Sequence, residues 1–336
     1  MSHVATAEQA EFRLEAYRGE LTGYCYRMLG SAFEAEDAVQ ETFLRAWRSL
    51  DGFEGRSSLR SWLYRIATNV CLDMKDGSQR RARPMDLTAA QSADTPLREP
   101  LPEATWIEPI PDGRALPAGD PAEVAEMRES IRLAFIAALQ HLAPRQRAVL
   151  ILRDVLRWKA TEVAELLGTT VASVTSALQR ARATLADGDV SANAPPKPSD
   201  GAQEELLARY VDAFERYDMD SLTSLLHADA TWSMPPYELW LQTHSDIREW
   251  CMGPGIGCRG SRLVRVRANG SPAFAQYKPA PDGTYTAWSL QVLEITDQEI
   301  TGICFFLDTP RIFPLFDLPL RLAESDAFAA NAARTA

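Results

Sequence analysis

The stretch PRQRAVLILRDVLRWKATEVAELLGTTVASVTSALQRARATL, residues 144–185, gives the clearest structural signal in the chain. Its pattern predicts three consecutive helices, of which the last two form a helix-turn-helix. Gly168 stands between these two, where a left-handed C-cap favours glycine. Thr169 or Thr170 can then N-cap the second helix. The inward-facing residues of the first helix are Val163, Leu166 and Leu167.

The second helix has one apolar and one polar face. The apolar residues recur at three- and four-residue steps: Val171, Val174, Leu178, Ala181 and Leu185. The polar residues are Ser173, Thr175, Ser176, Gln179, Arg180 and Arg182. In a major groove these side chains can reach base edges and phosphates. The alternative is an ordinary helical hairpin with a solvated polar face.

The net charge of −11 argues against a nucleic-acid binder until the chain is divided. Residues 1–83 contain 12 basic and 12 acidic residues, but residues 56–83 contain seven against two. Residues 84–126 contain two basic and nine acidic residues, and residues 127–186 contain nine basic and four acidic residues. Residues 187–336 contain 12 basic and 21 acidic residues. Two basic regions are therefore separated by an acidic spacer and followed by an acidic domain, which provides two candidate phosphate-binding surfaces.

Length and composition bound the class of protein. A chain of 336 residues with 46% hydrophobic residues has enough material for two or three domains. It has no apolar run of about 18 residues, and its first residues, MSHVATAEQAEF, lack a signal pattern, so we expect a cytoplasmic protein. The five cysteines are scattered without a C-x-x-C pair, which favours buried thiols. We expect no metal and no cofactor.

The N-terminal region predicts helices with functional faces. A helix over residues 8–30 is followed by one in AFEAEDAVQETFLRAWRSLDGF, residues 32–53. Its predicted buried stripe is Val39, Phe43, Ala46, Trp47 and Leu50. Another face carries Asp37, Gln40, Glu41, Leu44 and Arg48. Polar residues on a helix are usually only solvated, so this face alone indicates no function.

A third N-terminal helix follows the loop from Gly55 to Ser58. Its predicted apolar face consists of Leu59, Trp62, Leu63, Ile66, Val70 and Met74, and Trp62 is expected in the core. Asn69 lies off that face. The basic patch that begins at Arg56 continues into Arg80, Arg81 and Arg83.

Three separated motifs, DAVQETFLRAW from Asp37, the segment 53–83 and the helix-turn-helix, together resemble the extracytoplasmic-function sigma factors of the sigma-70 family. The resemblance covers residues 8–83 and 128–186. It implies region 2 at 8–83, region 4 at 127–186, and core RNA polymerase and promoter DNA as partners. It also implies that the face with Asp37, Gln40, Glu41, Leu44 and Arg48 docks on the β′ clamp, with the β subunit as a further contact.

The resemblance also implies two DNA surfaces. In such proteins the loop and helix corresponding to 55–69 capture unstacked bases of the −10 element, and the second helix of the helix-turn-helix reads the −35 element. Base capture needs a snug pocket with polar groups, and arginines can hold the strand by its phosphates. The −10 candidates are Arg56, Ser57, Ser58, Arg60, Arg65 and Asn69. Many relatives carry Lys or Arg where this chain has Thr175 and Ala177, which leaves Arg180 and Arg182 as the main −35 cations.

Residues 84–126 form the connection between the two sigma regions. Their prolines and acidic balance argue against a packed helix, and an extended chain of about 40 residues could span on the order of 130 Å. In sigma factors the corresponding linker passes through the active-site cleft and RNA exit path of the polymerase. Trp106, in the hydrophobic island 106–112, is the candidate anchor of the linker on a neighbouring domain.

After a second linker at 187–203, residues 204–320 change in character. Helical patterns come first and long strand patterns follow, with a hairpin signal at Pro281-Asp-Gly283, which indicates an α+β domain. This part resembles the SnoaL-like branch of the NTF2-like fold through residues 206–214, Ala230-Thr-Trp-Ser-Met-Pro and 291–308. The expected fold is thus two all-α sigma domains followed by an α+β SnoaL-like domain, with a tail at 321–336.

Some SnoaL-like proteins are isomerases or cyclases, and others only bind a ligand or a protein. The polar candidates for acid–base chemistry are Asp218, His227, Asp229 and His244, but no pair has diagnostic spacing. We therefore expect no catalytic residues, and a small apolar ligand is the candidate for the pocket of this domain. The resemblance implies that the fused domain modulates the sigma regions in place of an anti-sigma protein.

Two other functions stay open: a stand-alone helix-turn-helix regulator and a SnoaL-type enzyme with a DNA-targeting domain. The apolar tail 311–322 should not stay in water. Our hypothesis is that it packs, with the adjoining sheet, against the sigma domains or the Trp106 island.

Overall fold

The computed structural model describes residues 14–50, 53, 55, 57–75, 80–116, 121–187, 201–296 and 299–323. The chain forms two compact units, and each unit is made of two segments that are separated in the sequence. The first unit comprises Met1–Arg81 and Asp112–Ala192, and the second comprises Ala82–Pro111 and Asn193–Ala336. The first part of the connection between the sigma-like regions thus belongs with the C-terminal part of the chain.

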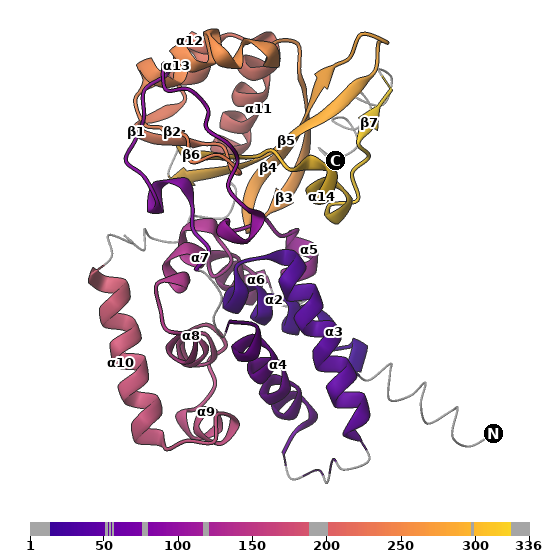
Figure 1. Cartoon of the computed structure of the whole chain (residues 1–336), viewed down its shortest axis with the longest axis vertical. Coiled ribbons are helices and arrows are strands. Elements are labelled where there is room, and N and C mark those ends of the chain that lie inside the picture. Colours follow the sequence, from indigo (N-terminus) through magenta and orange to yellow (C-terminus); the bar gives the residue numbers. More distant parts are fainter. Residues whose placement is uncertain are drawn as a thin grey trace, which may run out of the picture. The chain divides into compact units, whose positions relative to one another are not determined.

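The regular elements of the first unit are all helices in the part of the chain that the structure describes (Figure 1). Its helices are α2 Arg18–Leu29, α3 Ala32–Arg48, α4 Leu59–Lys75, α5 Asp112–Ala115, α6 Pro121–Glu129, α7 Leu133–Gln140, α8 Pro144–Leu150 with a π-helical extension Ile151–Val155, α9 Ala160–Leu166 and α10 Val171–Asp187. Gly30 ends α2 with a φ of 76°, and the Ser31 side chain accepts from the Glu34 amide at the start of α3. The predicted turn between the first two helices is confirmed.

Two buried arginines tie the N-terminal helices to α6–α8. Arg27 of α2 donates to Ser130 Oγ at 3.0 and 2.7 Å. Arg147 of α8 donates to the Met28 carbonyl and, at 2.8 Å, to Gln140 Oε1. Burial lowers the pKa of both guanidinium groups to about 10, because water stabilises the cation better than the interior does. These contacts make the two sigma-like regions parts of one compact unit.

The prediction that the connection contains no packed helix is wrong at α5 and α6. The short helix α5 packs against α2, where a Cβ on Gly23 would collide with the carbonyl oxygen of Ala115. Glycine at this position permits the close approach of the two backbones. The expectation was based on proline content, but a proline in the first turn of a helix, such as Pro121 of α6, does not oppose it.

The predicted helix-turn-helix is confirmed in α9 and α10. Gly168 has a φ of 60°, and Thr170 Oγ1 accepts from the Ser173 amide at 3.1 Å. The apolar face of α10 is correct at Val174, Leu178 and Ala181, which are buried. Val171 is an error in the prediction, since it is 43% exposed. As the first residue of α10, it directs its side chain back beyond the part of the helix that packs.

Trp47 was also assigned wrongly to the core. Within the predicted stripe of α3, Val39 and Ala46 are fully buried, but Trp47 is 46% exposed. Leu44, one turn before it, is 51% exposed. The apolar pattern therefore continues beyond the part of α3 that packs, and it leaves two large apolar side chains on the surface.

The second unit is an α+β domain, as predicted (Figure 1). Its elements are α11 Gly201–Arg216, α12 Met219–Thr223, β1 Leu226–Ser233, β2 Trp240–Leu241, α13 His244–Met252, β3 Arg262–Ala268, β4 Ser271–Pro279, β5 Tyr285–Thr296, β6 Glu299–Phe306, α14 Thr309–Leu315 and β7 Arg321–Leu322. The sheet order is β2-β1-β6-β5-β4-β3, and β7 pairs with β5. Only the β1–β6 pair is parallel among the described strands. Gly283, with a φ of 78°, completes the predicted hairpin between β4 and β5.

The residues of α11, α12 and α13 form one core with one face of the sheet. Tyr210 and Phe274 lie in this core, with ring centroids 5.7 Å apart. Phe305 of β6 belongs to the same core, so its neighbour Phe306 lies on the opposite face of the sheet. The sequence patterns did not predict α13 or the two-residue strand β2.

Residues 82–111, called the linker strap below, run along this domain. The strap backbone is held by β2 through Gln91 N–Trp240 O at 2.9 Å, and by the loop between β1 and β2 through Leu101 N–Pro236 O at 3.0 Å. At its end, Ile110 O accepts from the Asn269 amide at 3.0 Å. Because the strap is fixed to the domain at these places, it does not form the freely extended connection that the sequence predicted.

The apolar tail packs within the same unit. Phe313 of α14 is fully buried, and its ring meets that of Tyr277 edge-on with centroids 5.3 Å apart. The pairing of β7 with β5 extends the domain beyond the predicted boundary at residue 320. None of the described helices is long and apolar enough to cross a membrane. Cys25, Cys71 and Cys251 are buried free thiols.

Candidate nucleic-acid and polymerase interfaces

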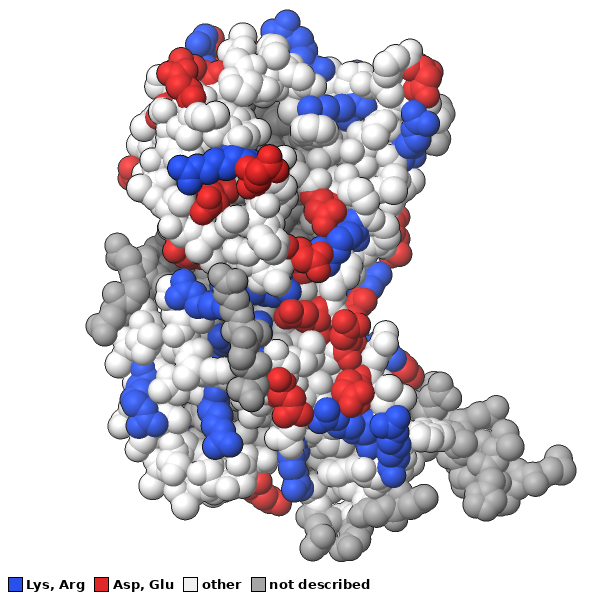
Figure 2. Space-filling model, viewed as in Figure 1, with Lys and Arg blue, Asp and Glu red and all other residues white. Residues whose placement is uncertain are grey.

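The candidate polymerase face of α3 lies on the surface. Asp37, Gln40, Leu44 and Arg48 are exposed and follow one side of the helix, and Glu41 between them is half-buried. Arg45 Nε donates to Glu41 Oε1 at 2.7 Å, and Arg45 also contacts Asp73 of α4 at 3.1 Å. Figure 2 shows acidic side chains gathered over α3.

Sequence reasoning missed a neighbour of this face. Trp47 is exposed. It lies beside Leu44, because residues three apart on a helix are neighbours. Exposed large apolar side chains next to polar ones are typical of protein interfaces. The signal in the sequence was the length of the apolar stripe, which exceeds what one core can cover.

Four of the six candidate −10 residues line two cavities of the first unit. Ser57, Ser58 and Arg65 line one of about 250 Å³. Asn69 lines the other, of about 310 Å³, together with Trp62, Arg45, Arg48, Ser49 and Ile66. Arg56 lies outside the described residues.

Trp62 is only half-buried, so its assignment to the core is wrong. Its ring packs on that of Phe53, with centroids 4.9 Å apart, and reaches the cavity beside Asn69. An indole next to an amide offers a stacking surface and hydrogen-bonding groups for a base. Tyr64, by contrast, is fully buried.

Arg60 is engaged inside the unit. Its guanidinium contacts Glu20 at 2.9 Å and lies over the rings of Tyr64 and Trp158, with distances to the centroids of 5.2 and 5.3 Å. The Tyr64 and Trp158 rings are 5.0 Å apart. This cluster connects α4 to the segment before α9, and it engages the Arg60 guanidinium with partners inside the unit.

The cavity with Arg65 is closed on its other side by α9. Glu162, Glu165 and Leu166 of α9 line it together with the serines. Two carboxylates thus lie near the cation that was expected to contact the single strand.

The six −35 candidates are all exposed on α10, and Figure 2 shows basic side chains over the helical unit. Thr175 Oγ1 donates to the Val171 carbonyl at 3.0 Å. Arg182 donates to Asp154 through Nε at 2.9 Å and Nη2 at 2.7 Å. Two hydrogen bonds to Asp154 raise the pKa of Arg182. The sequence treated Arg180 and Arg182 alike, whereas the structure gives only Arg182 this partner.

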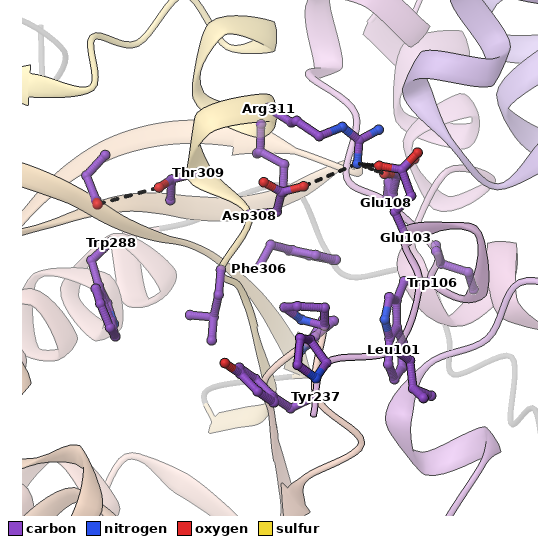
Figure 3. A pocket seen from close by; sticks show the side chains of 17 residues that line it. Leu101, Glu103, Trp106, Glu108, Tyr237, Trp288, Phe306, Asp308, Thr309 and Arg311 are labelled. Atoms are coloured by element: carbon purple, nitrogen blue, oxygen red, sulfur yellow. Dashed lines mark hydrogen bonds and ion pairs between the residues drawn. The ribbon is translucent and has the colours of Figure 1, made fainter. Parts of the chain in front are cut away.

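Trp106, the candidate linker anchor, is 3% exposed within the second unit. The backbone around it pairs with Ala82, through Ala82 N–Thr105 O at 2.8 Å and Ile107 N–Ala82 O at 3.1 Å. Arg311 of α14 contacts Glu103 at 2.5 Å and Glu108 at 3.0 Å, which links the tail to the strap. A cavity of about 490 Å³ lies beside Trp106 (Figure 3).

The four acid–base candidates lie outside that cavity. Asp218 caps α12 by accepting from the Ser221 amide at 3.0 Å. His227 Nδ1 accepts from the Asp229 amide at 3.1 Å, and His244 Nε2 contacts the His227 carbonyl at 3.0 Å. The buried hydrogen bonds between side chains that the structure describes in this domain join neutral groups, such as Tyr210 and Gln291 at 2.7 Å.

Comparison with known proteins agrees with this division. The model of Sigma-70 region 2 matches residues 14–81, that of Sigma-70 region 4 matches 132–185, and that of the SnoaL-like domain matches 207–303. The ECF RNA polymerase sigma factor SigG of Mycobacterium tuberculosis is 47% identical over 313 residues, which cover 91% of this chain and 82% of SigG.

A second relative shows the same fold. SigJ of Mycobacterium tuberculosis, also an ECF RNA polymerase sigma factor, is 32% identical over 227 residues, covering 67% of this chain and 64% of SigJ. The crystal structure of SigJ matches with a TM-score of 0.57 at 24% identity, over 93% of this chain and 99% of that structure. With both sigma-70 regions in order and this similarity to SigG, the chain belongs to the extracytoplasmic-function sigma factors, the sigma subunits that direct RNA polymerase to promoters, and carries a SnoaL-like domain.

Proposed function

We propose that three surfaces of the first unit divide the work of promoter recognition. The α3 face with Asp37, Gln40, Glu41, Leu44 and Arg48, extended by Trp47, docks on the β′ clamp of core polymerase. The loop and helix from Gly55 to Asn69 capture the −10 element, and α10 reads the −35 element. The observation that carries this assignment is the exposure of all described −35 candidates and of most of the α3 face on helices that match the two sigma-70 regions.

The −10 surface needs an opening of the first unit. Arg60 is held between Glu20 and Trp158, and Arg65 shares its cavity with Glu162 and Glu165. DNA would compete with these contacts for the same cations. Core polymerase, which binds the two regions at separate places, supplies the free energy that separates them.

The SnoaL-like domain modulates this step by binding the linker strap. A strap fixed to the domain cannot at the same time pass through the polymerase cleft, so docking opposes assembly with the polymerase. The support is the set of strap contacts, above all the buried Trp106 and the ion pairs of Arg311. The domain acts here as a binding module without catalysis, and the protein acts in the cytoplasm, where its polymerase works.

Reversing one charge tests the modulation. Arg311→Glu places a fourth carboxylate beside Glu103, Glu108 and Asp308, and should release the strap. Arg321→Glu is the matched control, because Arg321 pairs with Asp282 at the β4–β5 turn and not with a carboxylate of the strap.

In transcription with core polymerase at limiting concentration, Arg311→Glu should raise the transcript yield by about threefold or more, since weakening one partly exposed ion pair is worth up to about 1 kcal/mol. Arg321→Glu should match the parent protein. Equal yields from the two variants would contradict the modulation. A footprint of the promoter by the protein without polymerase would instead favour a stand-alone regulator.

A further inference from the structure

The cavity beside Trp106 lies on the face of the sheet away from α11–α13. Phe306, which lines it, follows Phe305 of the helix-side core, and consecutive residues of a strand point to opposite faces. Three parts of the second unit form its walls: the linker strap, the loop Pro235–Tyr237, and the adjacent ends of β5 and β6 together with α14. Its volume of about 490 Å³ is in the usual range for small-molecule sites.

Aromatic rings from four segments surround the cavity. Figure 3 shows Trp106 of the strap, Tyr237 of the loop, Trp288 of β5 and Phe306 of β6 around one space. Trp288 is 42% exposed, although large apolar side chains are usually covered where a partner is available. The Lys278 ammonium, which does not line the cavity, lies 3.2 Å from the centroid of the Trp288 ring. This contact is a cation–π interaction within the domain, in which Lys278 already occupies one face of the Trp288 ring.

The charged groups of the cavity are predominantly acidic. Arg311 Nη1 lies 2.5 Å from Glu103, 3.0 Å from Glu108 and 3.2 Å from Asp308, and all four residues line the cavity. Three carboxylates around one guanidinium leave an excess of two negative charges. An anionic ligand would be repelled by this excess, whereas a cation would be attracted by the carboxylates and the ring faces together.

We propose that this cavity is a binding site for a small organic cation, an amine or quaternary ammonium group on an aromatic or apolar body. The body fills the space between Trp106, Tyr237, Trp288 and Phe306, and the cationic group lies toward Asp308 and the two glutamates. Because the strap provides one wall, such a ligand stabilises the docked strap. The binding itself does not depend on the modulation proposed above.

Binding of three probes of similar size to the full-length protein tests the site: benzyltrimethylammonium, benzyl alcohol and benzoate. Isothermal titration calorimetry at constant ionic strength should show that benzyltrimethylammonium binds about tenfold tighter than benzyl alcohol, as cation–π attraction of about 1–2 kcal/mol implies. Benzoate should bind most weakly. Tighter binding of benzoate, or equal binding of all three, overturns the proposal, as does the absence of binding by any probe.

Two variants locate the bound probe. Trp288→Ala removes a partly exposed ring without opening the core, and Asp308→Asn removes one carboxylate. Each should weaken benzyltrimethylammonium about fivefold, and Asp282→Asn, which removes an equivalent paired carboxylate at the β4–β5 turn, should not. Thermal unfolding of each variant checks that the fold is kept. If Asp282→Asn weakens binding as much as Asp308→Asn, the effect is one of net charge and the assignment of the site is wrong.

Discussion

Arg180 and Arg182 lie two residues apart on α10, yet the structure predicts unequal contributions to binding of the −35 duplex. Arg182 makes two hydrogen bonds to Asp154, and the side chains are 61% and 29% exposed. An exposed ion pair of this kind stabilises by about 0.2–1 kcal/mol. Arg182 must break this ion pair before it can contact a phosphate. The free energy that the phosphate contact contributes to DNA binding is therefore reduced by the stabilisation that the ion pair provided.

The expected magnitudes follow from this difference. Arg180→Ala should cost about 1–3 kcal/mol, a loss of about 5- to 150-fold, if Arg180 binds a base edge in bidentate fashion. Arg182→Ala should cost less than about 1 kcal/mol, or about fivefold. Asp154→Ala removes a repelling carboxylate and releases Arg182. It should therefore raise the affinity and steepen the dependence of log K on log salt by about 0.9.

Fluorescence anisotropy measures the binding constants of the assembled holoenzyme for a labelled −35 duplex. The titrations are made between 50 and 200 mM salt, where the affinity depends strongly on phosphate contacts. Arg157→Ala is the matched control, because Arg157 is an exposed arginine outside α10, 3.6 Å from Glu126. Equal losses for Arg180→Ala and Arg182→Ala, or weaker binding by Asp154→Ala, would refute the reasoning.

Three further predictions concern the other surfaces. Replacing Asp37, Gln40 and Glu41 together with Ala should abolish core polymerase binding in a pull-down, while the free energy of unfolding changes by only about 0.5 kcal/mol per site; undiminished capture contradicts the polymerase face. Asn69→Ala should reduce permanganate reactivity of open-complex thymines and leave duplex binding nearly unchanged; a defect identical to that of an α10 variant would end this division. Trp106→Ala should destabilise the second unit by about 3–5 kcal/mol in urea unfolding, because the indole is buried, and a change below 1 kcal/mol would mean that the strap is not anchored there.

Local signals in the sequence determined the helix-turn-helix and the hairpin between β4 and β5. Gly168 and Thr170 define the turn between α9 and α10 through the chemistry of helix caps, which depends only on neighbouring residues. The hairpin at Gly283 follows from the same kind of local preference. The exposed polar face of α10 was predicted correctly because a periodicity of 3.6 residues separates the two sides of a helix.

Burial at the ends of elements was decided only by the tertiary structure. Trp47, Trp62 and Val171 continue apolar patterns, yet they are partly or largely exposed. A periodic pattern tells which side of a helix is apolar but not how far the neighbouring element extends along it. Where the neighbour ends, the same residue type changes from core to surface.

Pairings across long sequence separations also needed the structure. Arg60 with Trp158, Arg182 with Asp154 and Arg311 with Glu108 join residues that no local pattern connects. The sequence marked Trp106 as a candidate anchor, because an indole among prolines is costly to leave in water. Only the folded chain decided that the strap around it belongs with the SnoaL-like domain, since backbone hydrogen bonds to distant segments form only once the sheet has brought those segments together.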